Sequence, residues 1–146
     1  MNRSFKRPES VLVVIYAPDN QVLLLERCNP PGYWQSITGS LDWDEEPHAA
    51  ALREVREETG LSVNDRLIDC AYQNRFEILP AWRDRFAPDV HINTEYVFKV
   101  ELPEPFPIEI NPAEHTQSCW LPAPVAALQA SSYTNQIAIE RLLLRR

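Results

Sequence analysis

The chain lacks several features that would place it in a specialised class of protein. Its 146 residues include only three cysteines, Cys28, Cys70 and Cys119, which are odd in number and lack any close pair. This spacing favours neither a disulfide framework nor a zinc site, and it is typical of the reducing cytoplasm. The longest apolar run, which begins at Val11, is far shorter than the roughly twenty residues of a membrane span. No secretory pattern is visible, so we expect a soluble cytoplasmic protein.

Cations are also scarce in this sequence. Fourteen Lys and Arg residues face 21 Asp and Glu residues, which gives a net charge of -7. This balance argues against nucleic acid and anionic membranes as partners. A small polyanionic substrate would then need a metal ion and a few local cations. The length is that of one ordinary domain, and we predict a single domain over residues 1–146 that is a monomer or a weak dimer.

The apolar pattern predicts a mixed α and β protein. Two strands joined by Pro18-Asp19-Asn20 form a predicted hairpin, because proline sets the first turn dihedral. Four prolines between residues 103 and 112 predict an irregular connection. The predicted strands cover residues 11–17, 21–27, 34–38, 67–78, 94–102 and 118–121, and the two predicted helices cover 44–59 and 134–144 with Asp44 and Thr134 as their N-caps.

The central predicted helix carries three glutamates at helical spacing. Glu54, Glu57 and Glu58 are three and four residues apart, so they would share one face and repel each other. A bound divalent cation would remove that cost. Acidic residues on an amphipathic helix are usually just its solvated side, and the helix alone does not decide between these interpretations. Gly60 follows the last helical residue, where we expect a left-handed C-terminal cap.

The residues before the helix decide in favour of a site. Counting from Gly39, the chain has five residues, Glu45, seven residues, Arg53-Glu54, two residues, Glu57-Glu58, one residue and Gly60. Seven fixed identities at background frequencies match a given start by chance on the order of once in 10⁸. We interpret Glu45 and Arg53 as an ion pair that orients the loop against the helix.

This pattern resembles the Nudix box, the signature of hydrolases that cleave a nucleoside diphosphate linked to a further group. The resemblance implies an α/β/α sandwich with a mixed sheet and a catalytic loop-helix-loop. It also implies that Glu54 and Glu58 bind metal and that Glu57 is a further ligand or a base, which makes all three catalytic candidates. The Gly39 carbonyl is a common extra ligand. Magnesium, or manganese in its place, suits such oxygen ligands.

Segments outside the box resemble the Nudix subfamily that hydrolyses dihydroneopterin triphosphate to the monophosphate and pyrophosphate in folate biosynthesis. They are KRPESVLVVIYA near the start, WQSITGSL, FEI at 76–78 and AEH at 113–115. The resemblance implies that Glu114 is a metal ligand from outside the box. It also implies nine substrate contacts, namely Lys6, Arg27, Thr38, Phe76, Glu77, Ile78, Leu79, His115 and Ser132.

Two alternatives stay open at this point. A pyrophosphohydrolase of dATP or of an oxidised purine nucleotide would use the same chemistry, because its substrate also joins a fused ring to a triphosphate. A module that binds a nucleotide without cleaving it is the alternative outside enzymes. Such modules would be expected to have lost box carboxylates, and this chain has them all.

Overall fold

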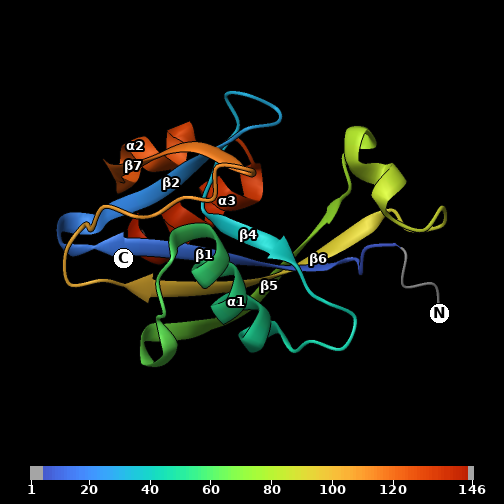
Figure 1. Ribbon diagram of the computed structural model, residues 1–146, viewed down its shortest axis with the longest axis horizontal. Coiled ribbons are helices and arrows are strands. Elements are labelled where there is room, and N and C mark those ends of the chain that lie inside the picture. Colours follow the sequence, from blue (N-terminus) through green and yellow to red (C-terminus); the bar gives the residue numbers. More distant parts are fainter. Residues whose placement is uncertain (1–4, 145–146) are drawn as a thin grey trace.

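The computed structural model describes residues 5–144, which form one mixed sheet between two layers of helix (Figure 1). The strands are β1 (Glu9–Ala17), β2 (Gln21–Arg27), β3 (Trp34–Gln35), β4 (Ile37–Ser40), β5 (Leu67–Glu77), β6 (Ile92–Glu101) and β7 (His115–Pro122). The helices are α1 (Pro47–Thr59), α2 (Ala123–Gln129) and α3 (Tyr133–Ile139), and a π-helical turn over Glu140–Leu144 follows α3. None of the described helices is long and apolar enough to cross a membrane.

Strand β1 is the centre of the sheet. It runs parallel to β6 from Glu9 to Tyr16 along one edge. The other edge is shared, because β4 pairs with β1 between Ser10 and Val13 while β2 pairs with it only at Tyr16 and Ala17. Strand β2 therefore diverges from β1 after the turn. Its far end pairs with β3 at Leu25 and Glu26, and β7 pairs with β2 along its whole length. This divergence separates β2 and β4 near the predicted box.

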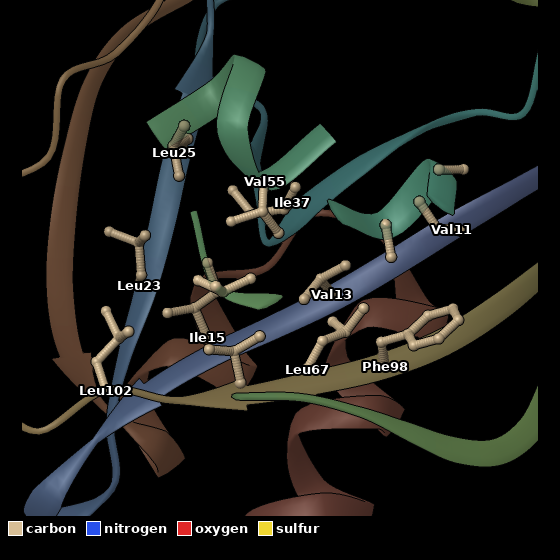
Figure 2. Packing of buried hydrophobic residues seen from close by; sticks show 14 of the residues in the cluster. Val11, Val13, Ile15, Leu23, Leu25, Ile37, Val55, Leu67, Phe98 and Leu102 are labelled. Carbon is tan, nitrogen blue, oxygen red and sulfur yellow. The ribbon is translucent and has the colours of Figure 1, made fainter. Parts of the chain in front are cut away.

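Alternate residues of β1 bury against different helices. Val11, Val13 and Ile15 belong to the cluster that includes Val55 of α1. Figure 2 shows Val55 and Ile37 over the strand that carries Val13 and Ile15. Leu12 and Val14 point the other way, into a cluster with the alanines of α2 and with Ile139 of α3. The period-two alternation of a strand thus accounts for the predicted three-layer order.

Most predicted elements are confirmed, with shifts at their ends. The 18–20 connection is a short 3₁₀ turn in which Asp19 and Asn20 have positive φ. The long strand at 67–77 is bent, since its pairing with β6 shifts between Asp69 and Gln73. The strand predicted at 34–38 is two strands, β3 and β4, and the one predicted at 118–121 extends over all of β7. Residues 103–112 form no helix or strand, as expected.

Both N-terminal helix caps were predicted wrongly, and one helix was missed. Helix α1 begins at Pro47 after Glu46, and Asp44 belongs to the preceding loop because proline favours the first helical position. Ser132, not Thr134, caps α3 by accepting a hydrogen bond from the Asn135 N–H. Helix α2 follows β7 directly, and its APVAALQ sequence has the early proline and the alanines of a short helix. Gly60 ends α1 with φ 79°, as predicted.

Candidate functional site

The loop before α1 is held in place by two arginines. Arg53 donates from Nε and Nη2 to the two carboxylate oxygens of Glu45, both at 2.8 Å, which confirms the predicted pair. Its Nη2 also donates to the Ser40 carbonyl at 3.1 Å. From the other side, Arg7 Nη1 donates to the carbonyls of Asp42, Trp43 and Glu45. Side chains from both sides therefore set the path of residues 42–45.

Glu54 and Glu58 form a buried carboxyl pair beneath this loop. Glu54 is only 9% exposed and Glu58 only 1%, and their carboxyls are close enough to share a hydrogen bond when one of them is protonated. Burial raises the pKa of Glu54, although the Arg53 guanidinium at 2.8 Å opposes this shift. Burial, the hydrogen bond and the charges of Glu54 and Glu114 raise the pKa of Glu58 well above its ordinary value. Two adjacent buried carboxylates carry a free-energy cost that a cation would remove.

Two observations indicate that the pair fits a metal ion. Glu58 Oε1 is buried and has no hydrogen-bond partner among the described residues. Glu54 lies so close to Gly39 that a β-carbon there would be 2.2 Å from the Glu54 Cδ. Only glycine leaves room for this carboxyl. No three described His, Cys, Asp or Glu side chains converge as a ready metal cluster, but the carboxylate oxygens are of the type that magnesium prefers.

Glu57 and Glu114 occupy different positions relative to this pair. Glu57 is exposed on α1 and accepts a bond from Arg53 Nη1 at 3.2 Å, so it faces the loop clamp. Glu114 is exposed immediately before β7, and its carbonyl accepts from the Cys28 N–H at 2.8 Å. Glu114 lines the same cleft as Glu54 and Glu58, whereas Glu57 is absent from that lining.

The cleft beside the carboxyl pair has a volume of about 1010 Å³, and it collects residues far apart in the sequence. Gly39 and all nine predicted substrate contacts line it, although Glu77 and Leu79 are largely exposed at its rim. Three cations, Lys6, Arg27 and Arg85, lie together in this cleft. Burial lowers the pKa of Lys6, and the nearby charges of Arg85 and Arg27 lower it further. The cleft thus combines an acidic pair with local positive charge, as a polyanion with a metal ion requires.

His115 lies between the acidic pair and the rest of the cleft. It is buried, and its Nε2 is 3.7 Å from Glu58 Oε1 and 3.3 Å from Gln35 Nε2. Burial and the nearby Arg27 charge lower the pKa of His115 to about 4, so the ring is neutral near pH 7. Its Nδ1 has no partner among residues 5–144. A neutral ring with an open nitrogen can make a hydrogen bond to a ligand.

Sequence reasoning missed an aromatic part of the cleft. The rings of Tyr33 and Trp82 meet edge to face with centroids 5.8 Å apart, and the Arg27 guanidinium lies 5.4 Å from the Trp82 ring centroid. Trp82 belongs to a 3₁₀ segment, Pro80–Arg85, on the connection between β5 and β6. Nothing in the local sequence distinguishes these residues from surface aromatics. Their role depends on the fold that brings this connection to β2 and β3.

The fold and the site together define a Nudix hydrolase domain, and the chain belongs to this family: the NUDIX domain model matches residues 6–141. The chain is 43% identical to dihydroneopterin triphosphate diphosphatase of Escherichia coli strain K12, over 98% of this chain and 97% of that protein. It is 38% identical to the protein of the same name from Haemophilus influenzae, over 95% and 89%. The solved structure of the E. coli dihydroneopterin triphosphate pyrophosphohydrolase superposes with a TM-score of 0.89 at 44% identity, covering 96% of this chain and 97% of that one.

These findings confirm the predicted family and the predicted fold. Nudix hydrolases generally use divalent metal ions, which agrees with the buried carboxyl pair. The roles of the individual site residues remain predictions that the geometry of the cleft supports.

Proposed function

We propose that this protein hydrolyses dihydroneopterin triphosphate to dihydroneopterin monophosphate and pyrophosphate in the cytoplasm, with magnesium as its metal. The observation that carries the proposal is the combination of a complete box with a cleft that contains all nine predicted contacts. Relatives that share 38% and 43% identity over nearly the whole chain are named for this substrate. The whole of residues 1–146 acts as one Nudix domain in this proposal.

In this proposal the residues of the cleft have separate tasks. Glu54 and Glu58, with Glu114 from just before β7 and the Gly39 carbonyl, would hold magnesium. The bound ion would neutralise phosphate charge and favour attack by water. Lys6 and Arg27 would bind the phosphate oxygens, which compensates locally for a net charge of -7. Thr38, His115 and Ser132 would orient the substrate by hydrogen bonds.

The flat ring would lie at the aromatic side of the cleft. Phe76 is the second-to-last residue of β5, Ile78 and Leu79 follow the strand, and Tyr33 and Trp82 provide two further ring surfaces. Flat heterocycles stack well on such side chains. The partner is then a small-molecule triphosphate, with neither nucleic acid nor membrane involved, and the protein acts as a monomer or a weak dimer.

The experiment that tests this function compares substrates at equal concentration. Purified protein with magnesium is given dihydroneopterin triphosphate, dATP and an oxidised purine triphosphate, and pyrophosphate release is measured. We expect kcat/KM for the pterin to exceed that for either nucleotide by about tenfold or more, a difference of roughly 1.4 kcal/mol in transition-state binding. A preference for dATP or for the oxidised nucleotide would replace the pterin assignment with the nucleotide alternative. The absence of any hydrolysis would favour a binding module.

A further inference from the structure

Glu95 is a buried carboxylate in the cleft that the hydrolytic step does not use. It lies on β6, opposite Ser10 of β1, and is only 5% exposed. It is nevertheless one of the residues that line the cleft, together with Ser10, Asn93 and Asn135. Charged residues are almost never buried to this extent without a paired charge. The burial of Glu95 therefore calls for a functional explanation.

The partners of Glu95 within the described chain are neutral. Asn74 Nδ2 donates to its Oε1 at 3.1 Å, and the Thr134 hydroxyl donates a second hydrogen bond. None of the described Lys or Arg side chains forms an ion pair with it. An ionised carboxylate accepts about four hydrogen bonds, so two donors leave acceptor capacity open. Burial raises the pKa of this carboxyl, which is typical of a group that gains from a further donor.

Two tyrosines lie near this open acceptor. The charge of Glu95 acts on the hydroxyls of Tyr33 and Tyr72, which places both tyrosines near it. Tyr33 also contacts Trp82, so the carboxylate and the ring-binding side of the cleft are adjacent. A flat ring that stacks on these side chains would present its edge to the sheet. Glu95 is the buried acidic residue that the sheet contributes to the cleft, whereas Glu77 of β5 is exposed.

We infer that Glu95 selects the substrate ring by accepting two hydrogen bonds from its 2-amino-4-oxopyrimidine edge. This inference rests on the proposed function and deepens it. A pterin and a guanine both present a ring N–H beside an exocyclic amino group, and the two parallel donors match one carboxylate. Adenine presents a ring nitrogen acceptor beside its amino group, so one lone pair would face the carboxylate. A buried acceptor that loses its donors penalises the wrong ring strongly.

The test measures selectivity in Glu95→Gln, which keeps the shape but replaces one acceptor oxygen with a donor. We expect kcat/KM for dihydroneopterin triphosphate and for dGTP to fall about 10²-fold, mainly through KM. The value for dATP should change less than about threefold. Glu101→Gln is the matched control, because Glu101 is an exposed acid on the same strand, β6, and does not belong to the cleft lining. Its three kcat/KM values should stay within about threefold of the parent.

A second variant separates selectivity from folding. Glu95→Asp keeps the charge but withdraws the carboxylate by one methylene, and we expect it to lower the ratio of guanine to adenine activity in the same direction. An unchanged ratio in both variants, whether activity is kept or lost uniformly, would overturn the inference. A different result would contradict the proposed function, namely that the parent protein prefers a nucleotide to the pterin. In that case the dGTP to dATP ratio still tests Glu95.

Discussion

At the scale of single residues, the two buried glutamates of α1 differ in environment from the exposed one. Glu58 has an unpartnered buried oxygen and Glu54 contacts Gly39, whereas Glu57 bonds Arg53 at the surface of the helix. Helical spacing in the sequence therefore does not give the three glutamates equal roles. Helical periodicity predicted one shared face, but in the structure Glu57 faces the loop and only Glu54 and Glu58 reach the cleft, a difference that the packing against β4 determines.

We predict that Glu58→Gln lowers the rate of pyrophosphate release about 10²-fold or more, because it removes a charge that the metal and the phosphates require. Glu57→Gln is the matched control on the same helix and should lose distinctly less. Steady-state assays with saturating magnesium provide the comparison, and circular dichroism confirms that both variants are folded. If the two variants lose the same activity, Glu57 has an equal share in the site and the distinction made from their burial is wrong.

At the scale of elements, two glycines on either side of α1 in the sequence have different structural roles. Gly39 on β4 leaves space for the Glu54 carboxyl, while Gly60 ends α1 with a positive φ and donates its N–H to the Arg56 carbonyl. The first is required by a close contact and the second by backbone geometry. The same substitution at both positions therefore separates activity from stability.

We predict that Gly39→Ala lowers activity by at least about tenfold, because its β-carbon would displace the Glu54 carboxyl. Gly60→Ala should instead cost about 1–2 kcal/mol of unfolding free energy, the penalty of a left-handed alanine, with little change in kcat. Urea unfolding and steady-state kinetics on both variants measure the two effects. A Gly39→Ala protein with full activity would show that Glu54 can move without consequence for the reaction.

The elements also show where sequence reasoning succeeded. The box was predictable because its residues are close together in the chain and their spacing is set by one loop and one helix. The hairpin of β1 and β2 was predictable for the same reason. Asp44 was mistaken for a cap because the loop tied by Arg7 and Arg53 continues up to Glu46. Glu95, Tyr33 and Trp82 could not be found, since only the pairing of β1 with β6 and the connection after β5 bring them to one cleft.

At the scale of the whole molecule, the metal-free protein carries an electrostatic cost at its centre. The pKa of Glu58 is raised above its value in the unfolded chain. Its contribution to stability is therefore present below the ordinary carboxyl pKa and is lost as the pH rises through the raised folded pKa. A divalent cation binds the ionised form of Glu58. It therefore stabilises the folded protein most at high pH, where the loss of stability is greatest.

We predict that saturating magnesium raises the melting temperature by about 5 °C or more at pH 8 and by clearly less at pH 5, because ligand binding stabilises the folded state by mass action. Thermal scans with magnesium or with a chelator measure this difference. Glu58→Gln should reduce the magnesium effect at pH 8 by at least half. A magnesium shift that is independent of both pH and this substitution would place the ion elsewhere.

The two arginines that hold residues 42–45 have a thermodynamic consequence for ion binding. Arg7 and Arg53 contact this loop through its carbonyls and through Glu45, so the contacts that hold it come from the protein itself. The conformational entropy of the loop is thus lost when the chain folds and need not be lost again when an ion arrives. Binding is then expected to involve little backbone reordering, with an entropy dominated by water released from the ion and the carboxylates. The loop is therefore expected to be preorganised for a divalent ion.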